Sequence, residues 1–505
     1  MVSSDQLVLE KLCGYARQTA LLESIQSLLG WDERTLMPAA GAEHRAEQMT
    51  LLSGLIHGRW TAEEFGRWLG QLRESPLAAD PHSDTGATIR RLDRQYQRRV
   101  RVPKSLVEEL TRTAVLGQQA WQEARGASDF ARFLPWLEKM VRLKRQEAEA
   151  VGYEDCPYDA LLDEYEPDER TANVARALGE LRDALVPLVA RITQSPRQPD
   201  RSILRRRYPV QDQLAVGREA ASRIGFDFHR GRLDTTAHPF CSTIGPNDCR
   251  ITTRFDEHEF GQSFFSILHE AGHGIYEQGL RTDEFGLPLG TYTSLGIHES
   301  QSRLWENLVG RSRPFWQYFY PRVQSRFPAA LGEVSLEEFH FAVNDVRPSL
   351  IRVEADEATY NLHILVRFEL EQALLSGDLA PRELPGAWAE KYRTYLGVEP
   401  SNDAEGVLQD IHWASGAVGY FPTYTLGNLY AAQLFRQAEA DLGGLAGPIR
   451  RGQFETLRAW LREKVYQHGQ RYSAAELVQR ATGRPLDHRP LIDHLRSKFE
   501  PLYGV

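Results

Sequence analysis

Apolar residues recur at steps of three and four along most of this chain, which is the period of an amphipathic α-helix. The first such segment ends before Pro38, because proline interrupts the helical hydrogen-bond pattern, and the pattern resumes at Glu43. The helical pattern covers residues 6–29, 43–56, 105–151, 171–194 and, with loops at 397–406 and 419–427, residues 308 to the end. The sequence therefore predicts a mainly α-helical fold.

One stretch, Thr235 to Arg254, departs from this pattern. Two short β-prone runs, 242–244 and 251–253, flank the turn formed by residues 245–248 and predict a hairpin. Such a hairpin can offer an edge strand to an extended peptide, or it can simply cover the core, and the sequence favours neither. No internal repeat and no long flexible linker divides the chain, so we expect one domain over residues 1–505.

Composition narrows the class of protein. The chain has 505 residues, of which 42% are hydrophobic and 26% charged, as in ordinary globular proteins. Its net charge of −9 argues against nucleic acid or an anionic membrane as a partner. It has no apolar run of the roughly 18 residues that a membrane span needs, and Asp5 and Glu10 precede any sustained apolar stretch, which argues against a signal peptide. We therefore expect a cytoplasmic protein.

Two groups of residues have competing interpretations. Cys241 and Cys249 flank the predicted turn and can form a disulfide, but a reduced pair is favoured in a cytosolic protein. The Arg-rich segment 88–101 can be a nucleic-acid patch, but the acidic net charge favours a solvated helix face.

The strongest chemical signal is the stretch Ser266–Tyr276, which contains His269-Glu270-x-x-His273. Residues four apart lie on one face of a helix, so the two imidazoles can converge on one zinc ion. Glu270, about 100° around the helix, is placed to take a proton from an activated water. Two buried structural histidines are the alternative.

The helix that carries this motif is predicted from its flanking residues. Asp256 followed by Glu259 resembles a capping box and predicts the start, and Gly279 predicts the end. The apolar face of this helix consists of Phe260, Phe264, Leu268, Ala271 and Ile275.

A third metal ligand is needed. A metzincin would have glycine and histidine where this chain has Tyr276 and Gly279, so that class is excluded. In the remaining type of zinc-hydrolase site, the third ligand is a carboxylate from a following helix, which here would be residues 294–307. Glu299 is our choice, although spacing alone makes Glu306 nearly as good.

Several motifs in one order now point to a family. They are His269-Glu-Ala-Gly-His273, His298-Glu-Ser-Gln301, His238-Pro-Phe240, Asp248-Cys-Arg250-Ile-Thr252, Ile351-Arg352-x-x-Ala355-Asp356 and Gly406-x-x-Gln409-Asp410-x-His412-Trp413. With these motifs the chain resembles, over nearly its whole length, the zinc carboxypeptidases typified by the thermostable carboxypeptidase Taq.

The resemblance implies both architecture and activity. It implies a large helical fold with a deep groove and a minor β element, acting as a homodimer. It implies a metal held by His269, His273 and Glu299, zinc or else cobalt, with Glu270 as general base. The implied reaction is release of C-terminal amino acids from peptides with broad specificity.

Candidate substrate-binding residues follow from the same motifs. Tyr420, His412 and Arg352 are expected near the site, where a tetrahedral oxyanion needs donors. Arg352 also suits a terminal carboxylate, with a salt bridge to Glu354 or Asp356 as its structural alternative. His238 and Arg250 are expected to contact substrate or close the groove.

Two other functions remain open at this point. A zinc oligopeptidase or aminopeptidase can use the same metal site, and an inactive helical scaffold can bind peptides. The combination of Glu270 with three ligands argues against the scaffold, because binding alone does not need a general base.

Overall fold

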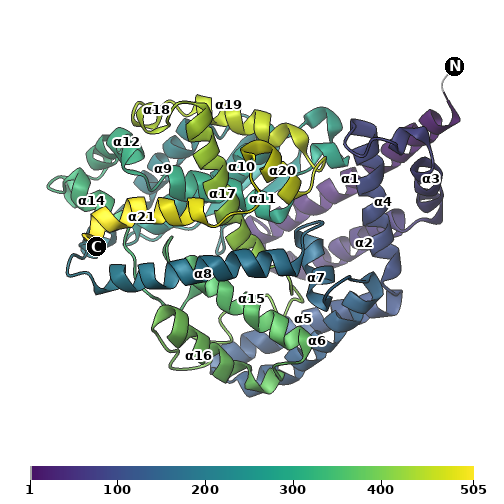
Figure 1. Ribbon diagram of the computed structural model, residues 1–505, viewed down its shortest axis with the longest axis horizontal. Coiled ribbons are helices and arrows are strands. Elements are labelled where there is room, and N and C mark those ends of the chain that lie inside the picture. Colours follow the sequence, from purple (N-terminus) through teal and green to yellow (C-terminus); the bar gives the residue numbers. More distant parts are fainter. Residues whose placement is uncertain (1–2) are drawn as a thin grey trace. The chain divides into compact units, whose positions relative to one another are not determined.

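The computed structural model describes residues 3–505 and consists mainly of α-helices with one small sheet, which confirms the predicted fold class (Figure 1). No described helix is both long and apolar enough to span a membrane. The chain forms two compact units, each from three separate segments. The first comprises residues 1–100, 200–343 and 434–483, and the second 101–199, 344–433 and 484–505. One domain over residues 1–505 stays a prediction.

The first unit contains the sheet and the motif-bearing helix. Its helices are α1 (Ser4–Thr35), α2 (Ala42–Trp60), α3 (Glu63–Arg73), most of α4 (Asp84–Arg101), α9 (Val210–Ile224), α10 (Phe260–Gly279), α11 (Leu295–Arg303), α12 (Arg313–Arg326), α13 (Pro328–Leu331), α14 (Leu336–Val343), α18 (Ala446–Arg450), α19 (Glu455–Lys464) and α20 (Ala474–Thr482).

The second unit is helical throughout its described elements. Its helices are α5 (Lys104–Ala127), α6 (Phe130–Val151), α7 (Pro157–Tyr165), α8 (Thr171–Gln194), α15 (Tyr360–Ser376), α16 (Leu384–Leu396) and α21 (Arg489–Tyr503), while α17 (Pro422–Asp441) contributes to both units. Helix α21 packs along α8 although some 300 residues of chain separate them (Figure 1). The predicted loop at 419–427 is wrong from residue 422 onward, because α17 begins at Pro422.

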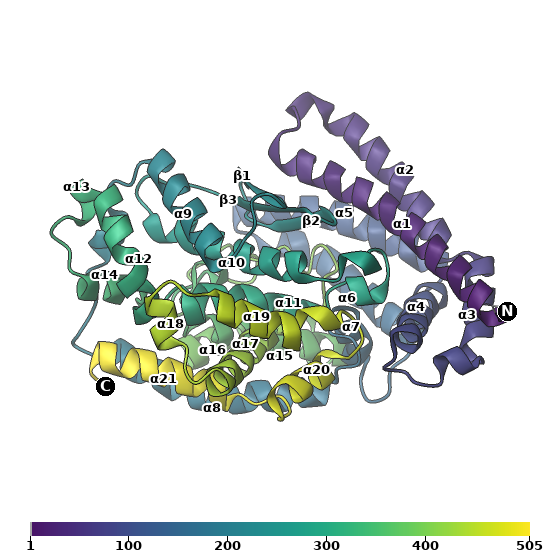
Figure 2. The ribbon, with the colours of Figure 1, turned by 90° about the horizontal axis from the view of Figure 1, so that it is seen from above.

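The sheet contains the predicted hairpin and one strand that the sequence did not reveal. Strand β2 (Cys241–Gly245) pairs antiparallel with β3 (Asp248–Thr253), and β1 (Gly231–Thr235) pairs parallel with the other side of β3. The order is therefore β1-β3-β2, with β2 at an edge. The sheet lies beside α10, which β3 and β2 contact (Figure 2). It thus supports the motif-bearing helix directly.

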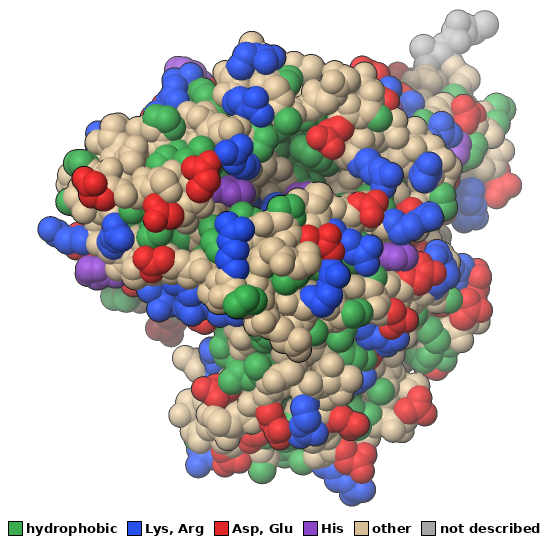
Figure 3. Space-filling model, turned by 60° about the vertical axis from the view of Figure 1, so that its left-hand side comes forward, with side chains coloured by type: hydrophobic (Ala, Val, Ile, Leu, Met, Phe, Trp, Pro, Cys, Tyr) green, Lys and Arg blue, Asp and Glu red, His purple; other side chains and the backbone are tan. Residues whose placement is uncertain are grey.

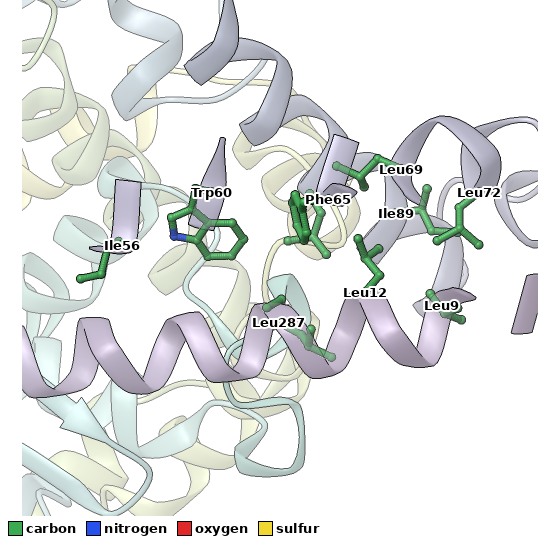
Figure 4. Packing of buried hydrophobic residues seen from close by; sticks show 11 residues of the cluster. Leu9, Leu12, Ile56, Trp60, Phe65, Leu69, Leu72, Ile89 and Leu287 are labelled. Carbon is green, nitrogen blue, oxygen red and sulfur yellow. The ribbon is translucent and has the colours of Figure 1, made fainter. Parts of the chain in front are cut away.

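The N-terminal helices share a hydrophobic cluster with the segment that follows α10. Leu12 of α1, Phe65 and Leu69 of α3 and Ile89 of α4 are almost fully buried, and Leu287 packs among them (Figure 4). Because Leu287 lies between α10 and α11, this cluster anchors the connection between those two helices.

Two arginines of α4, Arg90 and Arg91, do not lie on the solvated face that the sequence suggested. Arg91 is only 4% exposed and donates to the backbone oxygen of Gln470, while Arg90 donates to that of Arg471. Backbone carbonyl oxygens thus accept hydrogen bonds from both guanidinium groups. On the surface, positive and negative side chains are interspersed over the face seen in Figure 3.

Candidate metal centre

Helix α10 places the motif with an apolar face against the core. Phe260, Phe264, Leu268, Ala271 and Ile275 are all buried, as the periodicity predicted. The ring of Phe264 packs against those of Phe260 and Trp316. These contacts fix the rotation of α10 about its axis.

Only one of the two ends of α10 lies where the sequence predicted it. The helix ends at Gly279 as expected but begins at Phe260, with Glu259 at the N-cap position and no side-chain cap. The predicted start at Asp256 is wrong. Its carboxylate accepts a hydrogen bond from the amide of His258 at 2.7 Å, which closes a turn and leaves residues 256–259 outside the helix.

Gly272 lets α11 approach α10 closely. A Cβ atom at this position would lie 2.7 Å from the backbone oxygen of Gln301 and 2.7 Å from Cα of Ser302. Both atoms belong to α11, so any larger side chain would push the helices apart. Helix α11 begins at Leu295, within the predicted helical stretch 294–307, and the side chain of Ser294 at its N-cap accepts a hydrogen bond from the amide of Ile297. The glycine within the motif is thus what brings Glu299 to the two histidines.

His269, His273 and Glu299 form a set of donors that can hold a metal ion, with one ligand atom from each lying within 4.8 Å of the others. Oε2 of Glu299 is 3.7 Å from Nε2 of His269 and 3.5 Å from Nε2 of His273. Two ligand atoms on one tetrahedral zinc ion are about 3.3 Å apart. The site therefore fits such an ion with only a slight contraction.

Burial and neighbouring charges favour the protonation states in which these side chains can bind a metal ion. Burial lowers the pKa of His273 to about 3, which keeps its imidazole neutral, as metal binding requires. Burial opposes ionisation of Glu299, but Arg303 and His269 outweigh it and hold the pKa of that carboxyl well below its usual range. Burial raises the pKa of Glu270, which is 7% exposed, to about 7.

Comparisons with known proteins identify the family of this chain. The sequence model of the family described as "Carboxypeptidase Taq (M32) metallopeptidase" matches residues 11–499. The chain belongs to this family. It is therefore an enzyme of the metallocarboxypeptidase class, a metal-dependent hydrolase.

Individual relatives of the carboxypeptidase Taq family match over almost the entire chain. "Thermostable carboxypeptidase 1" of Thermus thermophilus is 49% identical over 504 residues, covering 98% of this chain and 99% of that protein. "Carboxypeptidase 1" of Bacillus subtilis is 38% identical and covers 98% and 97%. The crystal structure of the M32 carboxypeptidase from Deinococcus radiodurans R1 has a TM-score of 0.96 at 41% identity, covering 99% of this chain and all of that one.

Glu306, the competing third ligand, occupies a different position in this family member. Its Oε2 lies 2.9 Å from Nδ1 of His269, on the opposite side of the ring from Glu299. Arg303 bonds Oε1 of Glu299 at 2.7 Å and contacts Glu306 at 3.4 Å. Arg303 was not predicted from the sequence, although its position four residues after Glu299 on one helix was a usable signal.

The predicted substrate residues of the first unit lie in and beside the sheet. His238 is exposed in the loop between β1 and β2. Arg250 on β3 makes a two-pronged ion pair with Asp248, at 2.8 Å for each nitrogen, and its guanidinium lies 4.3 Å from the ring centre of Trp31.

The second unit brings Arg352, His412 and Tyr420 together around Tyr424. The guanidinium of Arg352 is 5.2 Å from the Tyr424 ring, Nε2 of His412 is 3.4 Å from the Tyr424 hydroxyl, and the two tyrosine rings are 5.3 Å apart. Three residues predicted from separate motifs thus form one cluster.

Arg352 has a partner that was not predicted from the sequence. It is 6% exposed and bonds Oδ1 of Asp410 at 2.7 Å and 3.0 Å, rather than Glu354 or Asp356. Asp356 instead caps the segment before α15 through the amides of Ala358 and Thr359.

Glu371 of α15 holds the loop that carries His412 and Tyr420. This buried carboxylate accepts hydrogen bonds from the indole of Trp413 at 2.8 Å, the amide of Gly419 at 3.2 Å and the hydroxyl of Tyr158 at 2.7 Å. Burial nevertheless raises the pKa of Glu371 to about 7.

We expect Gly272→Ala to weaken metal binding by roughly tenfold or more, as when groups that orient ligands are changed. The new methyl group meets backbone atoms of α11, and overpacking of this kind costs about 1–3 kcal/mol. Zinc affinity measured by chelator competition tests this. Gly261→Ala is the matched control in the same helix, because its Cβ meets only the Phe265 ring at 3.8 Å. Equal affinity of both variants and the natural protein would contradict the role given to Gly272.

We expect Glu371 to make stability depend on pH. Its pKa of about 7 in the folded chain lies above its ordinary value of 4.5, so the folded state binds the proton more tightly. Its contribution to the free energy of unfolding therefore decreases as pH rises from about 4.5 to 7. Denaturant unfolding at pH 5 and pH 7 should show a smaller pH effect in Glu371→Gln than in the natural protein. An identical pH effect in both would refute this assignment.

Proposed function

We propose that this metallocarboxypeptidase releases C-terminal amino acids one at a time from peptides of varied sequence, with Glu270 as general base. The observation that carries the proposal is the three-ligand donor set of His269, His273 and Glu299, with a buried carboxylate one residue away on the same helix. Zinc is the proposed metal, with cobalt as the alternative, because two imidazoles and a carboxylate suit a tetrahedral catalytic site.

A zinc ion in such a site supplies Lewis-acid activation of water and of the peptide carbonyl. Glu270 accepts a proton on its carboxylate as the water oxygen bonds to the carbonyl carbon. It then returns the proton to the amide nitrogen as the C–N bond breaks, which yields a new C-terminal carboxylate and a free amino acid. A pKa raised by burial to about 7 suits a group that must both accept and donate a proton near neutral pH.

Substrate binding is proposed for His238, Arg250, Arg352, His412 and Tyr420. The exposure of His238 and the partial exposure of Arg250 support access by a peptide. Part of the Arg352 guanidinium is hydrogen-bonded to Asp410, so a terminal carboxylate of a substrate would have to share the guanidinium with Asp410. The clustering of Arg352, His412 and Tyr420 around Tyr424 supports a joint role for those three.

A homodimer is proposed with the helices α1 and α2 as its contact surface. Leu21 and Ile25 of α1 are 56% and 49% exposed, and Leu51 and Leu55 of α2 are 66% and 50% exposed. Each pair is spaced four residues apart, so each helix carries an apolar stripe, and the two helices pack side by side (Figure 2). Contiguous exposed apolar side chains of this kind favour burial against a second copy of the same surface.

A cytoplasmic location is also proposed. All four cysteines are free thiols, including Cys241 and Cys249, whose sulfur atoms are 3.6 Å apart. This agrees with the expected reduced pair, because such thiols persist in a reducing compartment.

We expect Glu270→Gln to lower peptide hydrolysis by about 10²–10⁴-fold while zinc content stays intact, because the amide cannot accept the proton. Two substrates should be compared, one with a free C-terminus and a blocked N-terminus, the other with the blocks reversed. Release of single residues from the first alone supports the proposal.

Other outcomes of the peptide assay identify other activities. Cleavage of the second substrate alone would indicate an aminopeptidase, and internal cleavage an oligopeptidase. No cleavage with zinc bound would favour the peptide-binding scaffold. Glu10→Gln, an exposed change on α1, is the control and should keep full activity.

We expect Leu51→Glu combined with Leu55→Glu to convert a dimer into a monomer, because buried charges at the centre of an apolar contact are unpaired. Size-exclusion chromatography with light scattering measures the mass in solution. Val115→Glu on α5, where the native side chain is 63% exposed, is the control and should leave the mass unchanged. A natural protein that is monomeric at all concentrations would refute the dimer.

A further inference from the structure

We propose that His298 and Glu277 form a relay that fixes the tautomer and orientation of His273 as a metal ligand. The relay runs from the carboxylate of Glu277 through the imidazole of His298 to His273, so a second imidazole lies between the ligand and the carboxylate. This inference rests on the proposed metal site and assigns positioning roles to two residues that do not themselves reach the metal position.

The contacts form a continuous chain. Nε2 of His298 lies 2.8 Å from Oε1 of Glu277, and Nδ1 of His298 lies 2.5 Å from Nδ1 of His273. Nε2 of His273 faces Oε2 of Glu299 at 3.5 Å, on the side where the metal fits. The three side chains are 12–15% exposed, so water competes little for these hydrogen bonds.

The series of hydrogen bonds from Glu277 to His273 determines which nitrogen carries each proton. Because Nε2 of His273 needs its lone pair for the metal, its proton is on Nδ1, which donates to Nδ1 of His298. His298 must then carry its own proton on Nε2, which donates to the carboxylate of Glu277. The reverse direction would place a proton on Nε2 of His273 and block its use as a ligand. Glu277, by accepting only, selects the productive arrangement.

The helices and neighbouring rings hold the relay in place. His269, His273 and Glu277 are spaced four apart on α10 and so share one face, while His298 comes from α11. The ring of His298 lies 5.4 Å from that of Tyr276 and 4.9 Å from that of Tyr292. The close approach of α10 and α11 thus positions the relay as well as Glu299.

The other ligand histidine is supported differently. Glu306 contacts Nδ1 of His269 directly at 2.9 Å and also pairs with Arg303 and Arg311. A carboxylate that contacts a ligand histidine directly is the common arrangement. The inserted imidazole on the His273 side is therefore a specific feature that can be tested separately.

The test is metal affinity rather than catalysis alone. In His298→Phe a ring still fills the space between Tyr276 and Tyr292, but nothing accepts the proton on Nδ1 of His273. We expect zinc affinity, measured by chelator competition, to decrease by roughly 10–100-fold. Glu277→Gln keeps a hydrogen-bond acceptor for His298 and should decrease zinc affinity less.

A matched control exists in the second unit. Nε2 of His494 lies 2.8 Å from Oε1 of Glu357, the same kind of buried pair as His298 with Glu277 but in a different unit from the metal ligands. His494→Phe should keep the natural zinc affinity. Equal losses in His298→Phe and His494→Phe would overturn the relay in favour of a general loss of stability.

Two further measurements separate a relay from independent contacts. If Glu277 acts through His298, adding Glu277→Gln to His298→Phe causes no additional loss of affinity. If the two losses of zinc affinity were additive in the double variant, the relay would be refuted. The absorption spectrum of bound Co²⁺ should change in His298→Phe, because the ligand geometry changes, and an unchanged spectrum with unchanged affinity would also overturn the proposal.

These results are independent of the proposed activity. If the natural protein binds zinc but cleaves no peptide, the proposed function fails while the affinities still decide the relay. If His298→Phe and Glu277→Gln both bind zinc as the natural protein does, the relay fails while peptide cleavage is unaffected.

Discussion

The contact between α10 and α11 at Gly272 is the constraint on which the metal centre depends. One helix supplies two imidazoles and the proposed general base, and the other supplies the carboxylate, so the donor set exists only while the helices stay close. Backbone atoms of α11 occupy the space that any Cβ at Gly272 would need. Gly272 occupies one of the two variable positions between the histidines of the motif, yet the packing of α11 leaves room only for glycine there.

Buried charge organises the surroundings of both helices. Glu299 stays ionised because Arg303 and the imidazoles compensate for its burial, whereas Glu270 has less compensation and binds its proton more readily. Carboxylates of the same chemical type, on neighbouring helices, thus differ in role because of their surroundings. In the second unit, Asp410 is held between Arg352 and Arg367 and remains ionised for the same reason.

The sequence predicted those features that depend on local spacing. The helical fold, the end of α10 at Gly279 and the hairpin follow from periodicity and turn residues, and motif spacing indicates the two histidines of the proposed metal site. Strand β1 was missed because its pairing with β3 joins residues about 18 apart and leaves no local signature. The partner of Arg352 was missed for a similar reason, since Asp410 lies 58 residues further along.

The two possible third ligands show where spacing stops being informative. Glu299 and Glu306 are seven residues apart, which places them on similar sides of a helix. Only the structure shows that one faces the metal side of His269 and the other its opposite nitrogen. Sequence periodicity identifies a face of a helix, but it does not show which atom that face will meet.

The interleaving of the two units has a consequence for how the chain is made. Each unit draws on three segments, and the last segment of the first unit ends at residue 483. During synthesis, the unit that carries the metal ligands therefore lacks part of its core until nearly the whole polypeptide has left the ribosome. The segments that are synthesised first cannot complete their packing until distant segments have been made, and incompletely packed nascent chains of this kind depend on chaperones. No contiguous fragment of the chain contains either unit complete without much of the other.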